Sequence, residues 1–372
     1  MSEVPLFTND PGLAWLRAPS EPSLMSSWTL QEWDRVVRLA RRHRLLARLA
    51  RAVELHDLGE GVPEPVRPHL QSALNQSRAR VRALRWAAVR VRRTLGELGC
   101  PLLLLKGAAY LAQGLPVAEG RLPSDLDILV PRPCLDVASA RLGEAGWSEA
   151  PLDPLDRQYY VDWSHELPPM HNGSLGVELD IHHGILPPRD GLLVDTEVLL
   201  KDRAPCNWPG WQVLSPADQV VHCAAHLFLD SEPGDRVRDL VDLHGLMIHF
   251  GRTPAFWDDL RQRAVELALV EPVVLACHFV ARWIGPCAPD GWMQDLERIQ
   301  PRASRPLVRL LMEQVLRPSE PDDFDSLTKR TCAVVVLARY HWHRLPTRVL
   351  IPHLWRKWRM RRHDEHSSAN TA

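Results

Sequence analysis

Two aspartates, Asp125 and Asp127, lie two residues apart in the apolar segment SDLDILV at 124–130. Alternate residues of an extended strand point to the same face, so both carboxylates are expected to project together, with Leu126 and Ile128 packed behind them. Like charges at such close range repel each other unless a cation or a proton lies between them. Carboxylate oxygens are suitable ligands for Mg²⁺ or Mn²⁺, and the pair therefore predicts a divalent-metal site.

A second acidic strand is expected at 177–182, with the sequence VELDIH. Its apolar residues alternate with Glu178, Asp180 and His182, which therefore share the opposite face of the strand. Asp180 is thus placed to complete a three-carboxylate cluster with the aspartate pair.

A short apolar run at 102–105 ends abruptly at Lys106 and Gly107, and the good helix formers AAYLAQ follow at 108–113. This pattern predicts a strand, a turn and then a helix. A helix N-terminus with a glycine at the turn presents unpaired backbone N–H groups and the positive end of the helix dipole, where phosphate binds readily. We therefore expect phosphates and metal to share one pocket.

These motifs also follow one another in a recognisable order: Lys106-Gly107, Arg121, the segment from Ser124 to Val130, and the segment from Glu178 to His182. In this order they resemble the DNA-polymerase-β-type nucleotidyltransferase superfamily. Within it, the chain is most similar to a family of largely uncharacterised bacterial nucleotidyltransferases with an LKG motif before an R..DiDlLV motif. The resemblance covers most of the chain. It implies an α+β fold, in which a small mixed sheet with helices is flanked by N-terminal and C-terminal helical regions.

The resemblance implies a metal-dependent enzyme that transfers a nucleoside monophosphate from an NTP to an acceptor hydroxyl. It makes Asp125, Asp127 and Asp180 the catalytic residues and the ligands of Mg²⁺ or Mn²⁺. It places nucleotide binding at Lys106, Gly107, Ala108, Arg121 and Ser124. In the expected mechanism the acceptor hydroxyl attacks the α-phosphorus and Asp180 helps to deprotonate it. Pyrophosphate then leaves toward Gly107, where Lys106 or Arg121 neutralises its charge.

One position departs from the superfamily pattern, which usually has Gly-Gly or Gly-Ser at the phosphate turn. Here Gly107 is followed by Ala108, so a side-chain hydroxyl contact is lost while the backbone N–H remains. An alternative interpretation of Lys106 is that it occupies an ordinary solvent-facing strand end.

The rest of the chain is expected to be mainly helical. Ser27 or Thr29 is a suitable N-cap for a helix with an apolar stripe that begins at Trp33, and a second long helix should run from Val66 or Pro68 to about Leu98. After Ser215 and Pro216 the chain is expected to be helical again. The resulting division is an N-terminal helical region (1–97), a nucleotidyltransferase core (98–206), a C-terminal helical region (207–320) and a helical basic tail (321–372) with a disordered end.

Several histidines have positions that could make them metal ligands. His222 and His226 have i, i+4 spacing, but zinc needs more ligands and no glutamate occupies the metalloprotease position between them. We expect them to line the cleft or to make structural hydrogen bonds. A structural role is also favoured for His182 and His183, although their position after Asp180 gives them the stronger claim.

Acidic residues recur in the same C-terminal region, at Asp235, Asp239 and Asp242. We expect them to form a solvated helix face or to pair with Arg236 and Arg238, and not to be catalytic.

Composition limits the function further. The chain has 372 residues and a formal net charge of −1, so it has no basic excess that would indicate a long nucleic acid as partner. Its 7 cysteines are scattered without a CxxC motif, and no apolar run approaches the roughly 20 residues that span a bilayer. A soluble cytoplasmic protein is the expectation. The Trp/Arg-rich segment 354–362 is expected to pack on the helical region, with weak contact to a membrane surface or a polyanion as the alternatives.

Two other functions remain open at this stage. The chain could be a non-catalytic nucleotide-binding or scaffold protein of a biosynthetic cluster, in which Ala108 reflects an eroded phosphate turn. It could also be a metal-dependent phosphohydrolase that uses His182, His183, His222 or His226. For the transferase, acceptor choice depends on the helical surroundings and not on the metal motif. The resemblance favours a small molecule or a modified peptide as acceptor, because relatives of this family tend to lie in exopolysaccharide or peptide natural-product clusters.

Overall fold

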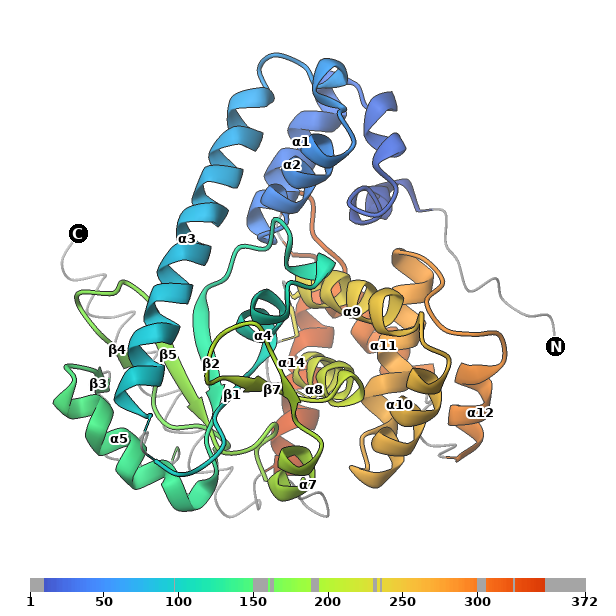
Figure 1. Ribbon diagram of the computed structural model, residues 1–372. Helices are drawn as coiled ribbons and strands as arrows, with labels where there is room; N and C mark the ends of the chain where they lie inside the picture. Colours follow the sequence, from blue (N-terminus) through green and yellow to red (C-terminus); the bar gives the residue numbers. More distant parts are fainter. Residues whose placement is uncertain are drawn as a thin grey trace, which may run out of the picture.

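The computed structural model describes residues 10–96, 98–149, 160, 164–188, 194–229, 233–234, 236–299, 306–323 and 325–344. In these ranges the chain has a mixed α+β fold, with one sheet and many helices (Figure 1). No described helix is both long and apolar enough to cross a membrane. The expectations for the Trp/Arg-rich tail segment 354–362 and for the disordered chain end fall outside the described residues.

The N-terminal helices project from the rest of the molecule (Figure 1). They comprise two 3₁₀ helices, η1 (Pro11–Leu16) and η2 (Pro22–Ser27), then α1 (Leu30–Arg42), α2 (Leu46–Leu55), the short η3 (Gly59–Gly61) and the long α3 (Arg67–Thr94). Thr29 caps α1 in a reciprocal capping box with Glu32, which satisfies two backbone N–H groups of the first turn. Trp33 and the apolar stripe that follows it are buried, as predicted.

The sheet lies beside the lower half of α3 (Figure 1). It consists of β1 (Leu103–Leu104), β2 (Asp125–Leu129), β3 (Ser148–Glu149), β4 (Met170–His171), β5 (Glu178–His182), β6 (Ala204–Pro205) and β7 (Gln212–Val213). The strand order is β3-β4-β5-β2-β1-β7-β6. Strands β2 and β5 are parallel neighbours, whereas β1 is antiparallel to β2 and parallel to β7. Both predicted acidic strands are therefore confirmed, and the sheet continues past Cys206 into β7.

Short helices connect and cover the strands. They are α4 (Lys106–Gln113), η4 (Pro116–Ala118), η5 (Arg132–Cys134), α5 (Leu135–Glu144) and α7 (Thr196–Lys201). Both α3 and α4 pack against β2, and Leu126 to Leu129 of this strand are buried. The strand with the aspartate pair is thus enclosed by helices, and only its first residue is partly exposed.

The C-terminal helices form a compact group on the other side of α4 (Figure 1). They are α8 (Pro216–Phe228), α9 (Val237–Phe250), α10 (Ala255–Glu266), α11 (Val270–Trp283), α12 (Trp292–Ile299), α13 (Pro306–Leu316) and α14 (Leu327–Arg344). Ser215 caps α8 by accepting a hydrogen bond from the N–H of Asp218, with Pro216 in the first turn, as predicted.

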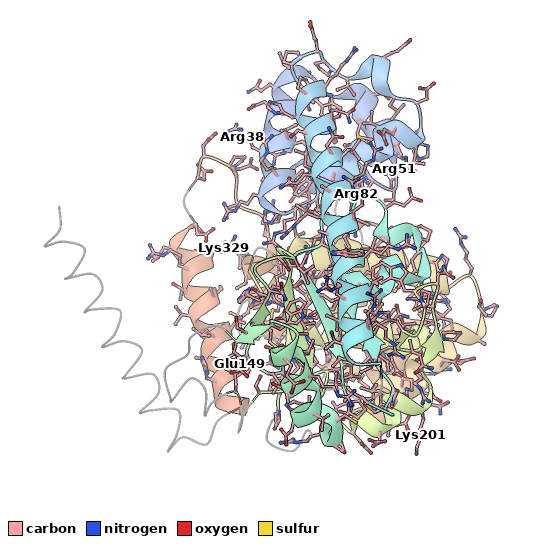
Figure 2. The ribbon with its side chains drawn as sticks, turned by 60° about the vertical axis from the view of Figure 1, so that its left-hand side comes forward. Arg38, Arg51, Arg82, Glu149, Lys201 and Lys329 are labelled. Atoms are coloured by element: carbon pink, nitrogen blue, oxygen red, sulfur yellow. The ribbon has the colours of Figure 1, made fainter. Side chains whose placement is uncertain are left out.

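Ion pairs connect the chain segment before α14 with the N-terminal helix α1. Arg35 pairs with Glu320, and Arg38 donates to Asp322 at 2.6 Å. In Figure 2, Arg38 and Arg51 mark the projecting N-terminal helices and Lys329 marks the beginning of α14. These pairs are partly exposed, so each contributes little to stability by itself.

A buried ion-pair network joins the three parts of the chain more firmly. Asp242 of α9 pairs with Arg48 of α2 and accepts a hydrogen bond at 3.1 Å from Nε of Arg121, which precedes β2. Arg48 also donates to the carbonyl of Val117 at 2.7 Å. Burial opposes ionisation of Asp242, but the charges of Arg121 and Arg48 outweigh it and lower the pKa of the carboxyl. Removing one partner from such a buried set typically costs about 3–5 kcal/mol.

Gly107 makes room for this network. A Cβ atom at Gly107 would lie 1.8 Å from a terminal guanidinium nitrogen of Arg121, which is itself held by Asp242. Arg121 is buried and also lies over the ring of Tyr110, at 5.7 Å from the ring centroid. The glycine is therefore required for close packing.

We predict opposite effects for two helical glycines. Gly107→Ala should lower the free energy of unfolding by about 1–3 kcal/mol, because the new methyl group displaces a pinned Arg121. Gly143→Ala in α5 is the matched control, since no atom lies within 4 Å of its added Cβ. It should raise stability by about 0.5–1 kcal/mol through helix propensity. Urea unfolding measures both changes, and a stabilised Gly107→Ala variant would contradict the packing role.

Candidate active site

The register of β2 and β5 brings the predicted carboxylates together. Asp127 lies directly opposite Asp180, and Asp125 lies opposite Glu178. Residues opposite each other on paired strands point to the same face, so the two strands present their acids to one point. Carboxylate oxygens of Asp125, Asp127 and Asp180 all lie within 4.8 Å of one another. The three-carboxylate cluster expected from the sequence is therefore present in the structure.

Asp127 is buried and its charge is neutralised by two groups. Nζ of Lys106 donates to Oδ1 of Asp127 at 2.7 Å, and Nε2 of His182 lies 3.0 Å from the same oxygen. Burial favours the protonated acid, but the charge of Lys106 and the contact with His182 outweigh it and lower the pKa of Asp127 far below its usual range. Asp127 is therefore ionised.

The same ion pair raises the pKa of Lys106. Burial disfavours its ammonium form, yet the charges of Asp127 and Asp125 raise its pKa above the ordinary value. Its side chain is 19% exposed and is directed into the carboxylate cluster. The alternative of a solvent-facing strand end is therefore wrong.

Asp180 has the least satisfied carboxyl group of the three. Its Oδ1 is buried and has no hydrogen-bond partner among the described residues. Burial first, and then the charges of Asp127 and Asp125, raise the pKa of Asp180 to about 8. A cation or a proton is thus needed at this oxygen.

Ser124 orients the third carboxylate. Its hydroxyl donates to Oδ1 of Asp125 at 2.9 Å, while Arg80 of α3 reaches the Ser124 carbonyl at 3.4 Å. The predicted nucleotide-binding serine therefore lies next to the metal-ligand candidates, where its described contact is with Asp125.

The predicted phosphate turn is built differently from the expectation. Gly107 and Ala108 are both buried in the first turn of α4, and the guanidinium group of Arg121 covers Gly107. The ionic partner of Arg121 is Asp242. A triphosphate contact through Gly107, Ala108 or Arg121 stays a prediction.

A cavity of about 400 Å³ opens beside the carboxylates. Asp125 and Asp127 line it on one side, and six cationic side chains also line it: Arg42, Arg44, Lys106, Arg121, Arg236 and Arg238. Arg42 is the last residue of α1 and Arg44 lies in the link between α1 and α2, whereas Arg236 and Arg238 come from the beginning of α9. The cavity is therefore enclosed by all three parts of the chain, and its lining is rich in positive charge.

Two residues that line this cavity have a strained backbone conformation. Arg44 and Lys106 have φ angles of 57° and 44°, in the left-handed region that non-glycine residues rarely occupy. Such conformations cost of order 1 kcal/mol or more and persist where the surrounding structure holds them, frequently at functional sites. Both strained residues direct a cationic side chain to the same cavity lining.

A second cavity of about 610 Å³ meets the first at Asp125. Arg44, Ser124 and Asp125 line both cavities, and the second is also lined by Arg80 and Glu178. Asp125 therefore stands at the junction of two spaces, of which the first is the more cationic.

The histidines of α8 are not part of a metal cluster among the described residues. His222 and His226 lie with ring centroids 6.3 Å apart, and burial lowers the pKa of His222 to about 3. His226 lines the first cavity, and its Nε2 lies 3.0 Å from a guanidinium nitrogen of Arg236. The expectation that this pair lines the cleft is confirmed for His226.

Pairing with a nearby arginine is confirmed for Asp239, whereas the expectation for Asp242 needs correction. Asp242 is 1% exposed and pairs with Arg48 and Arg121, and Asp239 is also buried, with Arg238 at 3.7 Å. Sequence reasoning considered only nearby arginines, whereas the partners of Asp242 come from distant segments. Asp235 lies outside the described residues.

Sequence reasoning favoured a structural role for His182 and did not single out Arg44. His182 had a usable signal, because it shares the strand face of Asp180, but its contact with Asp127 depends on the pairing of β5 with β2. Arg44 had no comparable signal, since one arginine among many in a helical region carries no information about the cavity that it lines.

A comparison with known protein families matches residues 29–285 to a family described as "Uncharacterised nucleotidyltransferase". No curated protein and no solved structure is significantly similar to the chain. The matched segment covers more than half of the chain and contains both acidic strands and every cavity residue named above. The chain therefore belongs to this uncharacterised nucleotidyltransferase family and is a nucleotidyltransferase.

Proposed function

We propose that this enzyme transfers a nucleoside monophosphate from an NTP to a hydroxyl of a small-molecule or peptide acceptor. Asp125, Asp127 and Asp180 would form the divalent-metal site of this reaction. The observation that supports the proposal best is the clustering of these three carboxylates within 4.8 Å, with Asp125 at the junction of two cavities. We further assign the sheet to the polymerase-β-like type, with the flanking helices as separate regions.

The donor set fits Mg²⁺ or Mn²⁺. All three groups offer oxygen ligands, which hard divalent cations prefer, and the buried Oδ1 of Asp180 has no described partner. When bound there, the ion would neutralise charge on the reacting phosphate and lower the pKa of a coordinated oxygen.

The cationic wall of the first cavity is the proposed site of the triphosphate. Arg44 is exposed and lines this cavity, as Arg236 does, so both guanidinium groups border the space beside Asp125 and Asp127. Guanidinium groups bind phosphate oxygens in a bidentate fashion, with charge-assisted hydrogen bonds. Lys106 lies between this wall and Asp127, where its ammonium group would contact the phosphate nearest to the carboxylates.

The second cavity is the proposed site of the acceptor. It reaches Asp125 from the side of β5, and its wall contains polar groups of Arg80 and Glu178. Asp180 would help to remove the proton of the acceptor hydroxyl, because it belongs to the carboxylate cluster in which a bound ion would lower the pKa of that hydroxyl. A polar hydroxyl-bearing acceptor suits this surface.

We predict that Asp125→Asn abolishes Mg²⁺-dependent NTP binding and the release of pyrophosphate, because the neutral amide is a poor ligand for the ion. The substitution is isosteric and its site is half-buried, so the melting temperature should change little. Asp136→Asn, on the exposed side of α5, is the matched control and should bind as wild type does. Isothermal titration with each of the four NTPs measures the effect.

The transferase and the non-catalytic nucleotide-binding protein give different results in this experiment. Metal-dependent binding accompanied by pyrophosphate release with a suitable acceptor supports the transferase. Metal-dependent binding without turnover across candidate acceptors would instead support a non-catalytic nucleotide-binding protein. Full activity of Asp125→Asn would rule out the proposed metal site.

Arg44→Ala should raise the Kd of the NTP–Mg²⁺ complex roughly 10-fold or more, because charge-assisted hydrogen bonds contribute about 1.5–3 kcal/mol. Arg93→Ala, on the exposed face of α3, removes the same charge away from the cavity and is the matched control. The measurement is NTP titration at low and moderate salt, with an AMP-type monophosphate in parallel. Equal loss for the monophosphate and the triphosphate would place Arg44 away from the β- and γ-phosphates.

A further inference from the structure

A second group of potential metal ligands lies beside the three aspartates. His165, Glu166 and His182 each offer a ligand atom, and these atoms all lie within 4.8 Å of one another. The backbone fixes the group, because Glu166 forms an isolated β-bridge with His182 and the N–H of His183 donates to the His165 carbonyl at 2.8 Å. The rings of His165 and His182 are 5.3 Å apart between centroids. Two extended segments thus direct three side chains to one point.

The hydrogen bonding of Asp127 determines which nitrogen of His182 carries a proton. Oδ1 of Asp127 accepts a hydrogen bond from the ammonium group of Lys106 at 2.7 Å, so this oxygen acts as an acceptor in its contacts. Nε2 of His182, at 3.0 Å from Oδ1 of Asp127, must therefore be the donor. In a neutral imidazole the other nitrogen, Nδ1, then has a lone pair and no proton.

The surroundings of His182 Nδ1 make an unprotonated nitrogen without a bound cation unfavourable. His182 is 1% exposed, and its Nδ1 is buried without a hydrogen-bond partner among the described residues. Oε2 of Glu166 lies 3.3 Å away, so a lone pair faces a carboxylate oxygen. This arrangement requires a cation between the two atoms or a second proton on the ring.

We propose that His182 Nδ1, the Glu166 carboxylate and the His165 imidazole bind one Zn²⁺-type transition-metal ion. Two imidazoles and one carboxylate are ligands that such ions accept and that Mg²⁺ does not favour. Asp127 receives the other N–H of His182 and is the outer partner of the site. A carboxylate in this place fixes the tautomer of a ligating histidine and increases its basicity.

This ion would have a positioning role. Two-metal catalysis places its ions about 3.5–4 Å apart. Here the imidazole ring of His182 separates the ion from Asp127, so the ion is too far away to be a second catalytic ion. Instead it would hold His182, and through it the orientation of Asp127. The site goes beyond nucleotidyl transfer and does not depend on it.

The test uses the full chain, stripped of metal with a chelator and dialysed against Zn²⁺ in excess Mg²⁺ without nucleotide. Wild type should retain one Zn²⁺ per chain. Loss of a hydrogen-bond partner of a metal ligand typically lowers metal affinity about 10–100-fold, and we expect this loss of Zn²⁺ affinity for Asp127→Asn. Glu166→Gln and His165→Ala remove a ligand itself, so their Zn²⁺ affinity should fall at least as much. Glu166 is 30% exposed at its side chain, so its replacement should leave the core intact, which circular dichroism checks.

Control variants separate this site from its neighbours. Nε2 of His171 and Oε2 of Glu178 form another histidine–glutamate contact on adjacent strands, at 3.6 Å, outside the three-residue group. His171→Ala should therefore retain Zn²⁺, and so should Asp125→Asn, which removes a ligand candidate of the carboxylate cluster only. The visible absorption of bound Co²⁺ gives a second measurement, and His165→Ala should change its bands.

Two results would overturn the proposal. One is equal Zn²⁺ retention by Glu166→Gln and wild type. The other is wild type without bound Zn²⁺, which would assign a second proton to His182 in place of the ion. Neither result bears on the carboxylate cluster, whose Mg²⁺-dependent nucleotide binding is measured separately.

Discussion

The negative charge gathered on β2 and β5 is the constraint on which the rest of this structure depends. Parallel pairing of the two strands places Asp127 directly beside Asp180, and both have little access to water. The fold counters this repulsion with specific partners, since Lys106 and His182 both contact Asp127. Asp180 has no such partner at Oδ1. The protein thus neutralises one carboxylate and leaves the adjacent one to bind a cation or a proton, which is the electrostatic pattern of a prepared metal site.

A second buried carboxylate, Asp242, is also neutralised by cationic partners, and here the ion pairs hold distant parts of the chain together. Its two arginine partners come from α2 and from the segment before β2, so neutralising one charge also fixes the N-terminal helices against the sheet and α9. The same contact positions the first cavity, because Arg44 lies immediately before α2. The ion pair between Arg48 and Asp242 therefore also helps to position the proposed triphosphate site.

The sequence predicted the features that local rules determine. Alternation along a strand identified Asp125, Asp127 and Asp180, and the Ser215-Pro216 pair identified the beginning of α8, because these patterns span only a few residues. The contact of His182 with Asp127 and the pair between Arg48 and Asp242, which are 194 residues apart, depend on how distant segments pack. No local spacing carries that information, which is why Asp242 was expected on a solvated face or paired with Arg236 or Arg238, and is instead buried with distant arginines.

The extent of the family match adds a further argument about the cavity. The matched segment ends at residue 285, before α12, although the chain segment that precedes α14 forms ion pairs with Arg35 and Arg38 of α1. Helix α1 ends at Arg42, so these pairs lie on the element that carries one side of the cationic wall. Partly exposed ion pairs contribute little to overall stability, but several of them on one helix limit its movement. Residues beyond the family segment therefore help to set the position of the wall that faces the carboxylates.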